Sequence, residues 1–441
     1  MPGLRRVILL GLALLLLPVA PALAVTVERV VSPLGIEAWL VRDHTNPIIS
    51  MSFAFRGGAI TDPPGKAGRA YMAGALLDEG AGDMDSLAFQ TRLEDLSVRL
   101  SFTAGRDDFS GSLKTLSENR TAAFDLLRLA VTQPRFDAEP VERIRSQIQV
   151  GLAREMQDPD QVASRRWFAA QFPDHPYGTP PNGNPETIKA ITVDDLRQFV
   201  AQRLARDNLV IGVVGDVTAE DLAGLLDSTF GDLPEKAAPV MVAETQPGAP
   251  GKVIVERRSI PQTVVVFGEG GIKRQDPDWY AAYVMNYILG GGGFSSRLME
   301  EVRVKRGLAY SVYSYLQPFD YVGLIVGGVA TENERVAQSL DLIRAEWRRM
   351  RDEGPSAEEL DNAKTYLTGS FPLQLSSTGA IAGILVAMQL DDLGIDYLDR
   401  RNAYIEAVTL EDVKRVAERL LDPERLTAVV VGDPKELAGA L

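Results

Sequence analysis

The second half of this chain repeats the first at a constant spacing, from Thr192 to Thr409 and from Gly215 to Gly432, without a gap. In both copies a threonine is followed three residues later by an aspartate, which is a signature of a capped helix start. An apolar strand that ends in Gly-Asp then follows in each copy. A repeat of this length predicts two homologous halves with the same fold.

The two halves are expected to span residues 25–235 and 251–441, joined by a linker over residues 236–250 that is rich in Pro, Ala and Gly. Within each half, short strands with alternating apolar residues mix with long helices. This order predicts an α+β fold in which each half has an antiparallel-rich mixed sheet covered by helices on one face. The predicted helices include residues 67–78, 276–289 and 296–304.

Residues 1–24 have the three parts of a signal peptide. Arg5 and Arg6 form a basic start, an apolar run follows over Val7–Val19, and Ala22-Leu23-Ala24 is a small-x-small cleavage site. We expect cleavage after Ala24 and export to the periplasm. The alternative, a retained membrane anchor, is disfavoured because the apolar run is short for a membrane span.

The net charge of the chain argues against some kinds of binding partner. Loss of Arg5 and Arg6 with the leader takes the formal charge from −14 to −16, which argues against a nucleic-acid or anionic-membrane partner. No later apolar segment reaches about 18 uninterrupted residues, so the mature chain is expected to be soluble. The chain has no cysteine, so stability must come from its cores rather than from disulfides.

Histidine is equally restrictive, because the chain has only His44 and His175, each in a turn-forming segment. A zinc site built from side chains needs about three Cys, His or carboxylate ligands, usually with His or Cys among them. A self-contained catalytic zinc site is therefore not expected, and both histidines are predicted to be ordinary loop residues. No Gly-x-Ser-x-Gly nucleophile elbow occurs either.

Four consecutive glycines, Gly290–Gly293, end one predicted helix just before the next. They could suggest a phosphate cradle, but the Lys-Ser/Thr that should follow is missing, as is the full dinucleotide fingerprint. The run is better explained as a backbone that turns sharply and approaches another element closely. Beyond it, Arg303 and Tyr310 bracket a second break at Gly307, which leads into an alternating strand.

The stretch Gly290–Tyr310, with Gly-Gly-Phe-Ser-Ser-Arg-Leu, then Arg303 and Gly-Leu-Ala-Tyr310, resembles the second homologous domain of the pitrilysin/insulinase-type metallopeptidases, family M16. Other stretches agree with this resemblance along nearly all of the mature chain. They are Phe55–Gly58 with Asp62, Gly68–Gly80, Phe172–Gly178 and Asn184–Ile188. The resemblance implies a mitochondrial-processing-peptidase-like fold, with the two halves forming half of a clamshell chamber.

In active members of that family a first-half helix carries His-x-x-Glu-His, and a distant Glu completes the zinc site. Laid on this sequence, those positions fall on Tyr71, Gly74, Ala75 and about Gly151, none of which can bind zinc in that role. The resemblance therefore implies a non-zinc-binding bacterial member with no cofactor of its own. Two-chain bacterial enzymes of this type, like mitochondrial processing peptidase, pair such a chain with a zinc-bearing one.

The resemblance also implies that Arg303 and Tyr310 reach across the chamber to the zinc site of the partner. There a guanidinium and a phenol would stabilise the negatively charged tetrahedral species formed when zinc-activated water attacks an amide. The plainer alternative is that Arg303 makes an ion pair on a helix surface and that Tyr310 is an aromatic residue of the sheet.

Three functional interpretations remain open. The first is a complementing subunit, inactive alone, of a heteromeric periplasmic zinc peptidase, with a zinc-bearing homologue as partner and unfolded peptides as substrates. The second is a purely structural or peptide-binding protein with no role in catalysis. The third is an autonomous peptidase with unrecognised ligands such as Asp78 and Glu79, although the acidic cluster Asp78, Glu79, Asp83 and Asp85 reads better as a solvated helix end and loop.

Overall fold

Two mixed sheets form the frame of the protein, whose computed structural model describes residues 25–435. The first sheet has the order β1-β2-β6-β3-β5-β4 and the second β7-β11-β8-β10-β9. The strands of the first sheet are β1 (Glu28–Val31), β2 (Glu37–Arg42), β3 (Ile48–Arg56), β4 (Arg99–Ala104), β5 (Asp108–Leu116) and β6 (Leu209–Gly215). Those of the second are β7 (Val253–Arg257), β8 (Gln262–Gly270), β9 (Ala309–Phe319), β10 (Val322–Glu332) and β11 (Thr427–Gly432).

All neighbouring strands pair antiparallel except β2 with β6 and β7 with β11, which are parallel. The parallel pair occupies a corresponding place in each sheet, as the duplication requires. The predicted helix starts at the two repeated threonines are confirmed. Thr192 and Thr409 each form a capping box with the aspartate three residues on, with nearly identical backbone angles.

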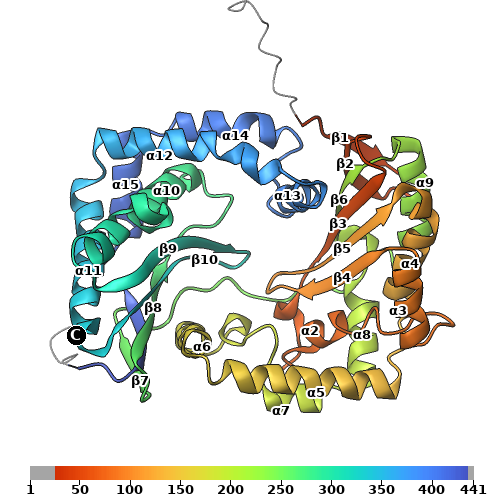
Figure 1. Cartoon of the computed structure of the whole chain (residues 1–441), viewed down its shortest axis with the longest axis horizontal. Coiled ribbons are helices and arrows are strands. Elements are labelled where there is room, and N and C mark those ends of the chain that lie inside the picture. The colour runs from red at the N-terminus through yellow and green to blue at the C-terminus, as the bar shows by residue number, and fades with distance from the viewer. Residues whose placement is uncertain (1–24, 436–441) are drawn as a thin grey trace, which may run out of the picture.

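Helices lie around both sheets (Figure 1). The first-half helices are α2 (Arg69–Gly74), α3 (Ser86–Asp95), α4 (Arg120–Thr132), α5 (Ala138–Glu155), α6 (Pro159–Gln171), α7 (Pro185–Ala190), α8 (Val193–Arg203) and α9 (Ala219–Phe230). The second-half helices are α10 (Trp279–Asn286), α11 (Val336–Glu353), α12 (Ala357–Gly369), α13 (Thr378–Leu390), α14 (Tyr397–Glu406) and α15 (Leu410–Leu420). The predicted α+β class, with antiparallel-rich sheets covered by helices, is confirmed.

The two halves exchange one helix each, which the sequence did not indicate. Helix α6 of the first half packs on β8 and β11 of the second sheet, and α13 of the second half packs on β3 and β6 of the first sheet (Figure 1). The expectation that helices cover only one face of each sheet is therefore wrong. The other face is covered by a helix from the opposite half, so β3 buries residues on both of its faces.

Close contacts hold each exchanged helix. Trp167 of α6 is fully buried and donates its indole N–H to the carbonyl of Thr427, 3.3 Å away. A Cβ on Gly268 of β8 would lie 2.8 Å from the Trp167 ring, so only glycine allows this approach. At the other contact, Arg56 of β3 donates to the carbonyls of Gln389 and Leu390, both at 2.7 Å, at the end of α13. Each half therefore lacks part of its core without the other.

Three predicted helices differ from the structure. The helix expected over residues 67–78 is regular only over Arg69–Gly74, because residues 75–79 tighten into turns with three-residue hydrogen bonds such as Leu76 N–H to the Ala73 carbonyl, 3.0 Å. The helix expected over residues 276–289 stays α-helical only to Asn286 and widens into a π-helical turn over Tyr287–Gly291. The helix expected over residues 296–304 is π-helical over Met299–Val304.

The segment over residues 236–250 has no helix or strand, but hydrogen bonds hold it against both halves. Ala238 N–H donates to the Gln202 carbonyl in the first half, 2.9 Å away, and Thr245 N–H donates to the Tyr321 carbonyl in the second, 3.1 Å away. No single helix among residues 25–435 is both long and apolar enough to cross a bilayer; residues 357–375 and 378–390 pass that test only as a pair bent by 118°. The predicted signal peptide, residues 1–24, lies outside the described residues.

Candidate functional site

Arg303 and Tyr310, which the sequence singled out, lie against each other in the structure. The Arg303 guanidinium carbon is 4.5 Å from the centre of the Tyr310 ring and 4.6 Å from that of the Phe294 ring. Both rings are largely exposed, at 78% for Tyr310 and 66% for Phe294. Arg303 is thus held by cation–π contacts between two aromatic residues at the surface of the second half.

Tyr310 owes its exposure to an irregularity in β9, the edge strand of the second sheet. Ser311 pairs with Ala330, but the next partner of β10, Thr331, pairs with Ala309, so Tyr310 is an extra residue. A bulge of this kind re-aims a side chain that regular pairing would place on the sheet face. It turns the Tyr310 ring out toward Arg303.

The glycine run brings the preceding turn close to the same strand. A Cβ on Gly290 would lie 2.3 Å from Ser314 Oγ and 2.7 Å from Ser314 N, so this position accepts only glycine. Ser314 Oγ in turn donates to the side-chain carbonyl of Asn286, 2.7 Å away, inside the core. The prediction that these glycines allow a close backbone approach is confirmed, and the element approached is β9.

A buried ion pair fixes the start of the π-helical segment that carries Arg303. Arg297 is 7% exposed and donates to both carboxylate oxygens of Glu359, at 2.6 and 2.7 Å, and to the Gly354 carbonyl, at 2.9 Å. Burial alone would raise the pKa of Glu359, but the hydrogen bonds from Arg297 and Ser356 outweigh it and lower that pKa to about 2. The pair therefore stays ionised and ties the segment to α12.

Arg303 itself makes no ion pair with any residue in the described part of the chain. The carboxylate of Glu301, on the same helical segment, instead forms ion pairs with Lys305 and Arg306, at 2.7 and 2.6 Å. The simple alternative of a helix-surface ion pair at Arg303 is not what the structure has. An exposed phenol and an unpaired guanidinium side by side form a donor pair suited to a developing negative charge.

The positions that the resemblance assigns to zinc ligands lie on or just after α2 and on α5, in the first half. Tyr71, Gly74 and Ala75 come from α2 and the turn after it, and Gly151 comes from α5, which packs beside α2. Tyr71 is 38% exposed, whereas Gly74 is buried. A Cβ on Gly74 would already lie 3.1 Å from the Phe109 ring, so a Glu at this position would not fit without repacking.

The acidic residues beyond α2 are committed to other contacts. Glu79 forms an ion pair with Arg143 of α5, 2.6 Å away, and also accepts from the Ser86 hydroxyl. Burial raises the pKa of Asp78 to about 6. No group of three or more His, Cys, Asp or Glu side chains within residues 25–435 could hold a metal ion. The structure thus gives no support to the interpretation in which Asp78 and Glu79 are zinc ligands.

Both histidines have structural partners. His44 Nδ1 lies 2.6 Å from Asp216 Oδ1 at the end of β6. His175 accepts from Tyr177 N–H through Nδ1, 3.2 Å away, which places its proton on Nε2, 3.1 Å from the Ala243 carbonyl. They are loop residues, as predicted, and His175 also helps to hold the linker segment.

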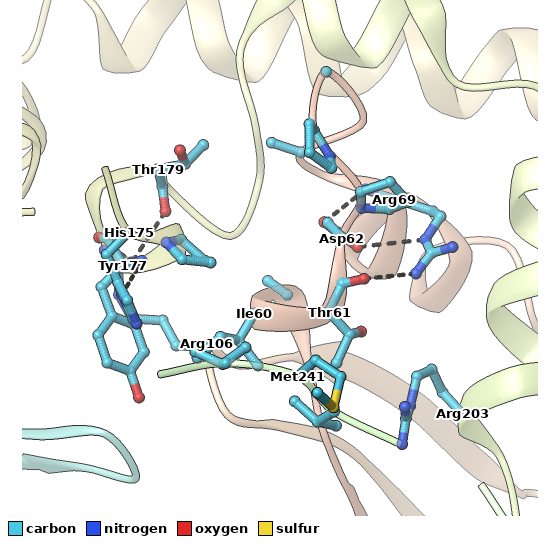
Figure 2. A pocket seen from close by; sticks show the side chains of 18 of the residues that line it. Ile60, Thr61, Asp62, Arg69, Arg106, His175, Tyr177, Thr179, Arg203 and Met241 are labelled. Atoms are coloured by element: carbon cyan, nitrogen blue, oxygen red, sulfur yellow. Dashed lines mark hydrogen bonds and ion pairs between the residues drawn. The ribbon is translucent and has the colours of Figure 1, made fainter. Parts of the chain in front are cut away.

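A pocket of about 550 Å³, which no sequence motif indicated, lies beside the start of α2. Figure 2 shows His175 and Tyr177 on one side of it and Arg69 and Arg203 on the other. The arginines come from separate segments and follow no motif, so only the folded chain brings them together. The pocket contains none of the four positions of the lost zinc site.

Comparison with known proteins agrees with the geometry of both halves. A family model described as "Peptidase M16 inactive domain" matches residues 190–367. A crystal structure of a peptidase M16 inactive domain from Pseudomonas fluorescens has a TM-score of 0.87 and 30% identity, over 93% of this chain and 98% of that one. A "non-peptidase homolog YmxG" of Helicobacter pylori is 26% identical over 89% of this chain and 91% of its own length. An "uncharacterized zinc protease" of Streptomyces coelicolor is 27% identical over 93% and 90%.

The chain belongs to peptidase family M16. It is an inactive M16-like protein, similar to a non-peptidase homologue. The four positions that the resemblance assigns to zinc ligands hold Tyr71, Gly74, Ala75 and Gly151.

Proposed function

We propose that this chain is the complementing subunit of a heteromeric periplasmic zinc peptidase. A zinc-bearing M16 homologue supplies the metal and the general base, and this chain supplies Arg303, Tyr310 and half of the peptide chamber. The observation that carries the proposal is the exposed Arg303–Tyr310 pair, retained and pre-positioned in a chain whose own zinc positions are lost.

The chemistry of the pair suits that role. When zinc-activated water attacks a peptide carbonyl, the oxygen gains negative charge, and hydrogen-bond donors that already point at it lower the barrier. Tyr310 is open to approach from outside the chain, and the aromatic contacts restrict the long Arg303 side chain before substrate arrives. Pre-positioning of this kind reduces the entropy lost in the transition state.

Substrates in this proposal are unfolded peptides. The free edge of β9 runs directly on from Tyr310, and one face of this strand carries Tyr313 and Tyr315, both more than 40% exposed. An extended peptide could pair with such an edge through backbone hydrogen bonds, while the aromatic rings contact its side chains.

The test is a peptidase assay on this chain mixed with a zinc-bearing homologue. Arg303→Ala and Tyr310→Phe are each expected to lower the rate of the mixture roughly 100- to 1000-fold, the usual effect of losing one such donor. Arg348→Ala, which removes an arginine from a surface pair with Glu424, is the matched control and should leave the rate unchanged. An unaltered rate in both site variants would defeat the proposal.

A second candidate is a structural or peptide-binding protein with no role in catalysis. The same exposed aromatic residues favour it, since they would bind peptide without any zinc partner. Peptide binding by the chain alone, combined with no effect of Arg303 or Tyr310 variants on the turnover of any partner, would support this second function over the first.

A further inference from the structure

A second pocket, of about 430 Å³, lies between α10 and β9 in the second half. Its lining comes from three stretches of the chain: α10 with the π-helical turn that continues it, the glycine run, and residues 313–316 of β9. Its volume is in the range of sites that take a small molecule or part of a peptide.

Aromatic rings form one wall of this pocket. Trp279, Tyr283 and Tyr287 follow one another at four-residue spacing, which places them on one face of a helix. All three are partly buried and pack against the core of the second half. Tyr287 also stacks on Tyr366 of α12, with ring centres 5.3 Å apart. The wall is thus held in place before any ligand binds.

Among the residues that the structure describes, no charged side chain lines this pocket. Its buried polar side chains satisfy each other, since Asn286 donates to the Ser314 carbonyl at 3.1 Å and accepts from the Ser314 hydroxyl at 2.7 Å. Burial, together with the neighbouring tyrosines, raises the pKa of Tyr287 to about 12, so its phenol stays neutral at neutral pH. The lining therefore holds no charge to pair with a charged ligand.

The best ring for binding a cation is already engaged. The guanidinium carbon of Arg274 lies 4.7 Å from the centre of the Trp279 ring, and Asp391 holds this arginine through an ion pair of 3.6 Å. A lysine side chain in the pocket would meet no carboxylate there to offset its lost hydration. An uncharged aromatic or large apolar side chain is favoured, because its burial needs no pairing.

The pocket lies on the same strand as the donor pair. Its β9 residues 313–316 follow Tyr310 by three to six positions, which is about 10 to 20 Å along a strand. We infer that this pocket holds an aromatic or large apolar side chain of a peptide, three to six residues from the bond that Arg303 and Tyr310 contact. The inference rests on the proposal that this chain holds peptides, but not on the catalytic role of the pair.

This pocket would favour one class of substrate. Large apolar side chains are mostly buried in folded proteins and become exposed when a chain is unfolded. A pocket that selects such a side chain therefore directs binding toward unfolded segments with an aromatic residue at the matching distance.

The test measures binding of fluorescein-labelled, C-terminally amidated peptides Ser-Thr-Gly-X-Gly-Thr-Ser to the purified full chain by fluorescence anisotropy. The peptide with Phe at X is expected to bind roughly 10-fold more tightly than the peptide with Ala. Lys or Glu at X should bind no more tightly than Ala. Equal affinity for Phe and Ala, tighter binding of Lys than of Phe, or no binding of any of the peptides would overturn the inference.

Variants then locate the site. Tyr283→Glu places a carboxylate in the aromatic wall and should reverse the preference, so that the Lys peptide binds more tightly than the Phe peptide; a misfolded chain would not show this reversal. Tyr283→Ala is expected to reduce the preference for Phe about 2- to 10-fold. The control Tyr404→Ala, which removes a partly exposed tyrosine of α14 outside the pocket, should keep it. Full Phe preference in both Tyr283 variants would contradict the assignment.

Failure of the pocket and failure of the catalytic role give different results. A preference for Phe that depends on Tyr283, together with no effect of Arg303→Ala on the rate of the mixture, would support the pocket and remove the catalytic role. Equal binding of the Phe and Ala peptides, together with a large loss of rate in Arg303→Ala, would remove the pocket and leave the catalytic role in place.

Discussion

The guanidinium carbon of Arg303 lies 4.5 Å from the centre of the Tyr310 ring, although a glycine break separates the two residues in the chain. Tyr310 lies at a bulge in β9, and Arg303 lies within the π-helical segment Met299–Val304. Such irregularities occur often beside functional sites because they re-aim single side chains. Here both irregularities flank one exposed pair of donors.

Phe294 is expected to act on Arg303 as a positioning residue. Its ring centre lies 4.6 Å from the guanidinium carbon, and an exposed cation–π contact contributes about 0.5 to 1 kcal/mol. Phe294→Ala should therefore lower the peptidase rate of the reconstituted mixture only about 2- to 5-fold, with Phe294→Tyr close to the unaltered chain. A loss as large as that of Arg303→Ala would mean that Phe294 contacts substrate itself.

The exchanged helices predict that neither half folds alone. Residues 25–250 would carry α6 without the sheet it covers, and residues 251–441 would leave β8 and β11 exposed. Expressed separately, the two fragments should lack cooperative thermal unfolding and bind a hydrophobic dye. Co-expressed, they should associate and recover one cooperative transition. A cooperative, monomeric fragment on its own would contradict this prediction.

Trp167 tests the same interface in the intact chain. It is fully buried against β8 and β11, so Trp167→Ala should lower the free energy of unfolding by about 3 to 5 kcal/mol. Phe294→Ala serves as the control aromatic truncation, since that ring is 66% exposed and should change stability by less than about 1 kcal/mol. Urea unfolding of both variants measures the difference.

Glu269 should make stability depend on pH in the neutral range. It is 4% exposed, accepts the Trp347 indole N–H at 2.7 Å, and burial raises its pKa from 4.5 to about 8. Between these values the folded state keeps a proton that the unfolded state has lost, so this contribution is complete below pH 4.5 and disappears as the pH rises through 8.

Glu269→Gln removes that titration while keeping an oxygen to accept from Trp347. Relative to this variant, the unaltered chain should lose on the order of 3 kcal/mol of unfolding free energy between about pH 5 and pH 8.5. Urea midpoints of both proteins at the two pH values measure the effect. Parallel pH dependence in the two proteins would show that Glu269 ionises normally.

Restoring the zinc ligands by substitution should fail. Tyr71→His, Gly74→Glu, Ala75→His and Gly151→Glu together recreate the ligand types, but Phe109 occupies the space that a side chain at position 74 needs. The quadruple variant should contain well below one zinc per chain by elemental analysis and should melt at a lower temperature. Gly151→Glu alone is the control, because no atom lies within 4 Å of a Cβ at Gly151. Stoichiometric zinc in the quadruple variant would contradict the prediction that Phe109 blocks a restored site.

Local patterns predicted most of the elements. Alternating apolar residues correctly indicated short strands mixed with long helices in both halves, and the repeated Thr-x-x-Asp pattern located two capped helices. The helix exchange was not predicted, because the apolar residues of a helix show that one face is buried but do not show which sheet that face packs against. The π-helical turns escaped prediction because they depend on tertiary packing, such as the close approach of Gly290 to Ser314. The early end of α2 lies at the tight turns of residues 75–79.

The candidate site was predictable only where its residues belong to a local motif. Arg303 and Tyr310 stood out through a recognisable motif, and the structure brings them together. Phe294 was not singled out, although its place beside the glycine run was a usable signal. Arg106 and Arg203 had no signal at all, since their shared pocket exists only after the linker residues 238–242 fold over it.

The most direct measurement is peptide cleavage by the purified chain alone, assayed with and without a metal chelator and alongside its mixture with a zinc-bearing M16 homologue. We expect no cleavage by the chain alone, and chelator-sensitive cleavage by the mixture that exceeds the activity of the homologue by itself. Chelator-sensitive cleavage by the lone chain would contradict the claim that it has lost its own zinc site.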